Sequence, residues 1–115
     1  MKLLLAVFIV LALPLAAADL TGVWDVSVDI GGNTGTPTIT LKQEGATLSG
    51  SYKGLLGEAP LKGTVDGNKV RWEFTADYDG NKFNVVYTGV VENDAIKGSI
   101  DFGGQAEGTF TAKRK

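Results

Sequence analysis

The sequence predicts an all-β protein: an eight-stranded antiparallel up-and-down meander barrel that follows an N-terminal signal peptide. Three observations support this fold class. Apolar and polar residues alternate with a period of two through most of residues 19–115, which is typical of strands that bury one face. Short segments rich in Gly, Asn and Asp separate the alternating runs. No run after residue 18 has a helical period.

The first segment has the layout of a secretory signal peptide. Lys2 supplies a positive charge, residues 3–13 are an unbroken apolar run, and Ala16-Ala17-Ala18 offers the small residues of a cleavage site. The run is shorter than the roughly 20 residues of a membrane span, and a core helix or a retained anchor is the alternative interpretation. We expect a signal peptide over residues 1–18 and a single domain over residues 19–115. The mature form would then be secreted or periplasmic, with no stable membrane span.

Eight alternating runs are expected to form the strands. In the first, at residues 23–30, Trp24, Val26 and Val28 share one face with Ile30. The remaining runs follow at residues 38–42, 47–53, 61–65, 70–78, 83–91, 96–102 and 106–112. Closing this meander into a barrel would bury the apolar face and remove both exposed edges, whereas a sandwich usually needs a long crossover that the chain does not show.

The connections predict how the strands pair. Two-residue turns are expected at residues 44–45, 67–68, 79–80 and 93–94, and Gly103-Gly104 lies in a turn that needs three residues. The two-residue turns place Leu41 opposite Leu48, Val65 opposite Val70, Phe74 opposite Val85, and Val91 opposite Ile96. Apolar residues meet in all four pairs, which a slip by one residue would destroy.

The inward face carries glycines and aromatic rings, which leaves two interpretations of the interior. Either the glycines allow close packing and the barrel is filled, or they leave a cavity for one small ligand. The candidate cavity residues are Trp24, Gly50, Tyr52, Gly63, Trp72, Tyr87, Gly89, Gly98 and Gly108. Because no charged residue points inward, such a ligand should be apolar. A leucine at Gly98 should be tolerated only if the cavity exists.

Gly54-Leu55-Leu56-Gly57 places two leucines at a hairpin tip, where polar residues are usual. Leu55 and Leu56 are therefore a candidate interaction loop. They either fold over the barrel mouth as a plug or contact a partner or a membrane.

Composition excludes several function classes. The 115 residues include no Cys and no His, and the net charge is −2. A Ser-His-Asp triad, a thiol nucleophile and a His or Cys metal site are therefore excluded, and no basic surface for nucleic acid is expected. Glu73 and Glu107 alternate to the outer face, where nothing would raise a carboxyl pKa. We predict no catalytic, cofactor-binding or metal-binding residues, and hence no enzyme.

Several segments together resemble a small exported β-barrel domain of bacteria that occurs alone or appended to secreted amidohydrolase-type enzymes. The segments are residues 22–26, 41–45, 48–50, 57–61 and 96–104. No activity is assigned to that domain, so the resemblance implies no functional residues. The Gly-x-Trp opening is more distantly similar to avidins and lipocalins, although avidin's polar inward residues and a lipocalin's long first loop are missing.

These observations lead to two candidate functions. The first is a non-catalytic secreted or periplasmic β-barrel that acts as a structural or protein-interaction module. The alternative is a carrier of a small apolar ligand inside the barrel. The expected partner is accordingly an unknown protein or a small apolar molecule.

Overall fold

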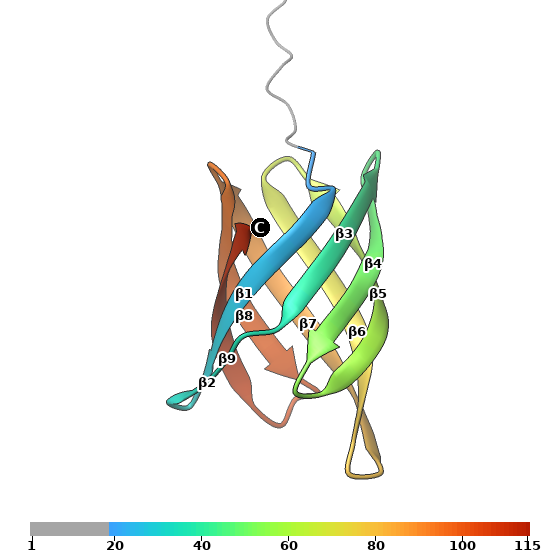
Figure 1. Cartoon of the computed structure of the whole chain (residues 1–115), viewed down its shortest axis with the longest axis vertical. Helices are drawn as coiled ribbons and strands as arrows, with labels where there is room; N and C mark the ends of the chain where they lie inside the picture. The colour runs from blue at the N-terminus through green and yellow to red at the C-terminus, as the bar shows by residue number, and fades with distance from the viewer. Residues whose placement is uncertain (1–18) are drawn as a thin grey trace, which may run out of the picture.

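One antiparallel sheet closes on itself to form a barrel (Figure 1). The computed structural model describes residues 19–115, and the predicted signal peptide at residues 1–18 lies outside that range. Within the described range the chain has no helix and nine strands. These are β1 (Gly22–Ile30), β2 (Asn33–Gly35), β3 (Thr38–Glu44), β4 (Thr47–Gly54), β5 (Gly57–Asp66), β6 (Lys69–Tyr78), β7 (Asn81–Glu92), β8 (Ala95–Phe102) and β9 (Glu107–Arg114).

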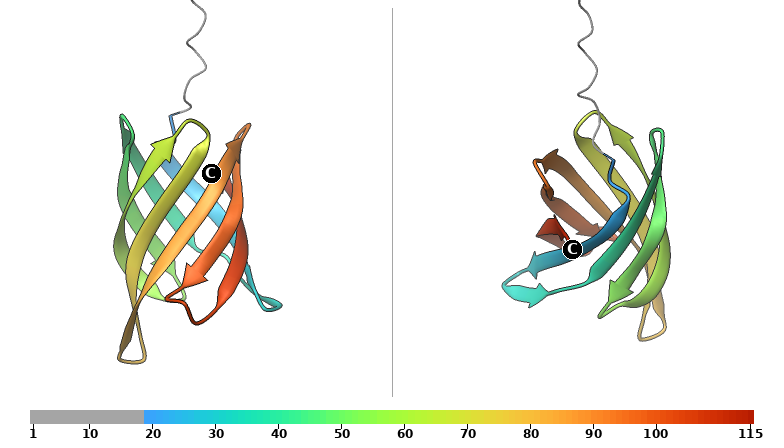
Figure 2. Two further views of the ribbon diagram at one scale, coloured as in Figure 1. Left: turned by 180° about the vertical axis from the view of Figure 1, so that it is seen from behind. Right: turned by 45° about the horizontal axis from the view of Figure 1, so that its top comes forward.

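Pairing between the first and last long strands closes the barrel. Val26 of β1 lies opposite Ala112 of β9, while consecutive strands from β3 to β9 pair with one another and β3 also pairs with β1. The two views in Figure 2 show the strands tilted around a common axis. The predicted eight-stranded up-and-down barrel is therefore confirmed, with β2 as an addition that the sequence did not reveal.

Because of strand β2, the two ends of β1 pair with different strands. The start of β1 pairs with β3, with Trp24 opposite Ile39, whereas the end of β1 pairs with β2, with Val28 opposite Gly35. The chain thus makes a small hairpin before it returns to the barrel wall. Alternation did not predict β2 because its three residues, Asn-Thr-Gly, contain no large apolar side chain.

Three of the four predicted pairings are confirmed, around the turns at 67–68, 79–80 and 93–94. The pairing of Leu41 with Leu48 is wrong: Leu41 lies opposite Gly50, and Gln43 lies opposite Leu48. The turn is Gly45-Ala46 rather than Glu44-Gly45, so the register slips by two residues. A slip of two preserves the inward and outward faces, because side chains alternate with a period of two. The last connection is the predicted three-residue turn, closed by a bond of 2.9 Å that the Phe102 N–H donates to the Ala106 carbonyl.

Aromatic side chains fill the middle of the barrel. The Trp72 and Tyr87 rings stack with centroids 5.3 Å apart, and Phe110 meets Tyr87 edge-on at 4.9 Å. Next to them, Tyr52 stacks on Phe74 at 4.2 Å. The fully buried aliphatic side chains around this cluster are Leu20, Val26, Ile39, Leu41, Leu48, Val85, Ile96 and Ile100.

Candidate functional site

A pocket of about 370 Å³ opens at the end of the barrel that holds β2 and the β4–β5 turn, the lower end in Figure 1. This volume lies in the range of small-molecule sites. Its wall is mainly apolar. The lining residues are Val28, Ile30, Asn33, Thr34, Gly35, Thr36, Pro37, Tyr52, Gly54, Leu55, Leu56, Tyr87 and Phe102.

The β2 hairpin and the return to β3 make one side of this pocket. Gly31 and Gly32 have φ values of 59° and 92°, which allows the tight reversal between β1 and β2. The Pro37 carbonyl accepts a bond of 3.0 Å from the Val26 N–H, which holds the returning segment against β1. Across the rim, a β-carbon on Gly54 would lie only 2.8 Å from Cβ of Pro37, so glycine is required there.

Two phenol side chains lie at the inner side of the pocket. Tyr52 and Tyr87 are 4% and 2% exposed, and both belong to the pocket lining. Burial raises the pKa of Tyr52, an effect partly offset by a hydrogen bond from the backbone of Leu56. Burial, with a smaller contribution from the neighbouring Tyr52, raises the pKa of Tyr87. Both phenols are therefore neutral hydrogen-bond donors at physiological pH.

The two leucines of the β4–β5 turn have different environments. Leu56 is partly buried and packs against the core, whereas Leu55 is 86% exposed. Both nevertheless line the pocket. Leu56 thus behaves like part of the predicted plug, while Leu55 presents an apolar side chain at the rim.

The inward glycines bring strands together. A β-carbon on Gly50, Gly63 or Gly98 would overlap a backbone carbonyl oxygen of the adjacent strand. At Gly89 and Gly108 it would lie 2.7 Å and 2.6 Å from such an oxygen. In the middle of the barrel the glycines therefore permit close packing. A leucine at Gly98 would clash with the backbone in either interpretation, so our expectation that it separates a filled barrel from a cavity is wrong.

Of the nine candidate cavity residues, the pocket brings together Tyr52 and Tyr87. The other seven, Trp24, Gly50, Gly63, Trp72, Gly89, Gly98 and Gly108, are not part of its lining. Trp72 stays close, since its ring stacks on Tyr87. Trp24 belongs to the opposite end of the barrel, where its indole N–H donates a bond of 3.0 Å to the carbonyl of the buried Leu20.

Sequence reasoning missed the side of the pocket that β2 and residues 36–37 provide. One signal was available, because the connection between the first two predicted strands, at residues 31–37, is longer than a tight hairpin and contains Gly31, Gly32 and Pro37. In a chain of short turns, a longer connection often carries the binding site.

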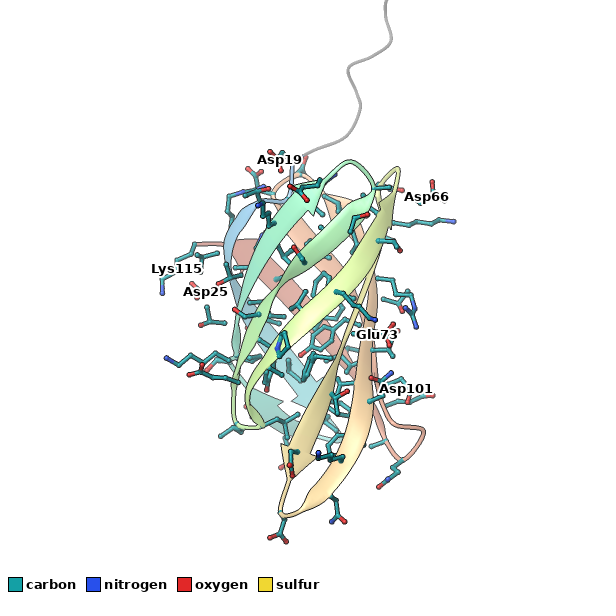
Figure 3. The ribbon with its side chains drawn as sticks, turned by 90° about the vertical axis from the view of Figure 1, so that its right-hand side faces the viewer. Asp19, Asp25, Asp66, Glu73, Asp101 and Lys115 are labelled. Carbon is teal, nitrogen blue, oxygen red and sulfur yellow. The ribbon has the colours of Figure 1, made fainter. Side chains whose placement is uncertain are left out.

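The acidic side chains do not converge on a site. Within the described residues, no group of three or more Asp or Glu side chains could hold a metal ion. Figure 3 shows the labelled carboxylates spread over the outside of the barrel. On the outer wall, hydrogen bonds from Asn84 and Arg71 hold the pKa of Glu73 below its usual value. A lowered pKa suits an ionised surface group rather than a general acid.

No protein-family model matches the chain, and no curated protein matches it either. In the described part of the chain, no helix has the length and apolar character to cross a membrane.

Proposed function

We propose that this chain is an exported, non-catalytic binding domain that holds one small apolar ligand in the mouth of its barrel. The observation that carries the proposal is the pocket of about 370 Å³, whose lining contains no Asp, Glu, Lys or Arg. An apolar wall gains free energy when a ligand displaces water from it, at about 25 cal/mol per Å² of buried apolar surface. A module that acts only through its outer surface would not need such a pocket.

Export is part of the same proposal and is supported by the features of residues 1–18. The absence of Cys and His from the sequence supports a non-catalytic role. The resemblance to an exported bacterial barrel domain agrees with both. A binding domain of this kind would either carry its ligand alone or present it to an enzyme to which it is joined.

Native mass spectrometry tests the proposal. The protein is exported to a bacterial periplasm, purified without detergent, and compared with Thr36→Trp, which should fill the mouth of the pocket. Thr40→Trp is the matched control, because Thr40 is exposed on β3 and does not line the pocket. We expect an extra mass of a few hundred daltons that is lost on denaturation, is missing from Thr36→Trp, and persists in Thr40→Trp. Protein that carries no extra mass and binds no added naphthalene would contradict the proposal.

Leu55 favours a second candidate function, a protein-interaction module. A leucine that is 86% exposed at the rim of an apolar pocket is suited to contact another protein. A photo-crosslinker at position 55 in exported protein would then capture a protein partner, while one at Thr75, exposed on the outer wall of β6, would not. Equal capture at both positions would argue against a specific interface.

A further inference from the structure

The polarity of the pocket restricts the charge of what it can bind. Its polar groups are the amide of Asn33, the hydroxyls of Thr34 and Thr36, the two phenols and the backbone. None of these carries a charge at neutral pH. An ionised ligand would lose its hydration without gaining a counter-ion, and an unpaired buried charge is strongly unfavourable. The ligand should therefore be neutral.

The Tyr87 hydroxyl is the polar group best placed to orient such a ligand. No hydrogen bond joins it to another described group, and it is not among the described polar atoms that are both sealed from solvent and unpaired. Since Tyr87 also lines the pocket, we place its hydroxyl at the pocket space.

Tyr52 is less suited to this role because its oxygen lies against the β4–β5 turn. A β-carbon on Gly54 would lie 2.6 Å from this oxygen, so the turn encloses it. Its ring instead supplies an apolar surface that is held in place by stacking on Phe74 at 4.2 Å. The pocket thus combines apolar walls with one available donor at its inner side, while the Asn33, Thr34 and Thr36 side chains belong to the β2 side of the pocket.

We propose that the ligand is a small, neutral, mainly apolar molecule of one or two rings with one acceptor oxygen, and that the Tyr87 hydroxyl donates a hydrogen bond to that oxygen. This inference rests on the proposed function and names the ligand class of the same pocket. The donor at the inner side would set the orientation of the ligand, with its apolar part toward Leu55 and the rim.

Three probes of similar shape test separately whether the ligand needs an acceptor oxygen and whether it must be neutral. They are 2-acetylnaphthalene, 2-ethylnaphthalene and 2-naphthoate. The first has a neutral acceptor, the second has none, and the third is an anion. Each is titrated into ¹⁵N-labelled protein, and the amide shifts of Gly35, Leu55 and Leu56 report pocket binding. We expect 2-acetylnaphthalene to bind about three- to tenfold more tightly than 2-ethylnaphthalene, as one neutral hydrogen bond implies. 2-Naphthoate should bind most weakly.

Tyr87→Phe keeps the ring and removes the donor. In this variant the two neutral probes should bind equally, at the affinity of 2-ethylnaphthalene in the unaltered protein. Thr88→Val removes an exposed hydroxyl from the next position of β7. This control variant should still bind 2-acetylnaphthalene more tightly than 2-ethylnaphthalene. The probe series on the unaltered protein tests the inference even if Tyr87→Phe folds poorly.

The results of these titrations can contradict the proposed ligand class or its donor without contradicting the proposed function. Equal binding of the two neutral probes by the unaltered protein, or tight binding of 2-naphthoate, would overturn the ligand class and leave an apolar pocket in place. A preference that survives in Tyr87→Phe would overturn the assignment of Tyr87 as the donor. If no probe shifts the amides of Gly35, Leu55 or Leu56, the proposed function fails as well.

Discussion

Gly98 lies so close to Thr88 that a β-carbon on Gly98 would overlap the Thr88 carbonyl oxygen. The same β-carbon would lie 2.5 Å from the α-carbon of Gly89, which is paired with Gly98 across β7 and β8. Strands can approach in this way only when a residue has no side chain. The close approach of β7 and β8 at this point therefore depends on glycine itself.

Gly98→Ala should destabilise the barrel by about 2–4 kcal/mol, because either the β7–β8 pairing or the local curvature must give way. Urea unfolding followed by tryptophan fluorescence measures this change. Ser99→Ala, an exposed substitution at the next position, should change the free energy of unfolding by less than about 0.5 kcal/mol. A loss below about 1 kcal/mol for Gly98→Ala would show that the backbone can adjust.

Arg114 fastens the N-terminal segment over the end of the barrel opposite the pocket. Its guanidinium donates bonds of 2.8 Å to the Thr21 carbonyl and 2.9 Å to the Asp19 carbonyl, and lies 4.5 Å from the centre of the Trp24 ring. Arg114→Met keeps the apolar stem and removes these interactions, so it should cost about 1–2 kcal/mol of stability. Lys113→Met is the matched control and should be close to neutral. Equal effects of the two variants in urea unfolding would contradict a specific role for Arg114.

Alkaline pH should weaken the fold through the buried phenols. Burial raises the pKa of Tyr52 and Tyr87 above the ordinary value of 10.0, so folding favours their neutral forms. Their contribution to stability is fully present below about pH 10 and is lost as the pH rises toward the folded-state pKa values. The urea midpoint should be constant between about pH 7 and 9 and fall above about pH 10, with a smaller fall in Tyr87→Phe. An unchanged fall in that variant would assign the effect to other groups.

Substitutions of the two leucines in the β4–β5 turn should affect ligand binding and the free energy of unfolding differently. Leu55→Ser removes an exposed side chain, so it should leave the free energy of unfolding within about 0.5 kcal/mol and weaken binding of 2-acetylnaphthalene. Leu56→Ala removes partly buried apolar surface and should lower stability by about 1–2 kcal/mol as well as weaken binding. Urea unfolding and the NMR titration measure the two effects. Unchanged binding in Leu55→Ser would remove Leu55 from the site.

Local patterns predicted most of the barrel wall. The alternation in residues 70–78 and the Asp79-Gly80 turn together led to the pairing of Phe74 with Val85, because Asp79 and Gly80 both adopt positive φ, at 55° and 82°. The same reasoning misplaced the turn near Gly45, since a single glycine can occupy either of the two turn positions. Alternation could not detect that slip, because moving by two residues leaves every side chain on its original face.

The candidate site was less accessible from the sequence. Tyr52 and Tyr87 were recognised as inward residues because they lie in phase with their apolar neighbours. The segment from Asn33 to Pro37 was not, because it is polar, irregular and part of a connection. Its role as a pocket wall arises from packing against β1 and against the β4–β5 turn, which is about twenty residues farther along the chain.

The positions of the eight barrel strands, the inward face and the closed up-and-down topology follow from the order of apolar, polar and turn residues. These are local properties, and one closed sheet satisfies all of them together. Whether the interior is filled, and where space remains, depends on distances between residues remote in sequence. The glycines bring strands β3 to β9 close enough to fill the middle, while the β2 hairpin diverges from β3 and leaves a pocket beside Tyr52 and Tyr87. Only the tertiary structure decides where strands approach closely and where a pocket remains, because these distances join backbone segments that are far apart in the sequence.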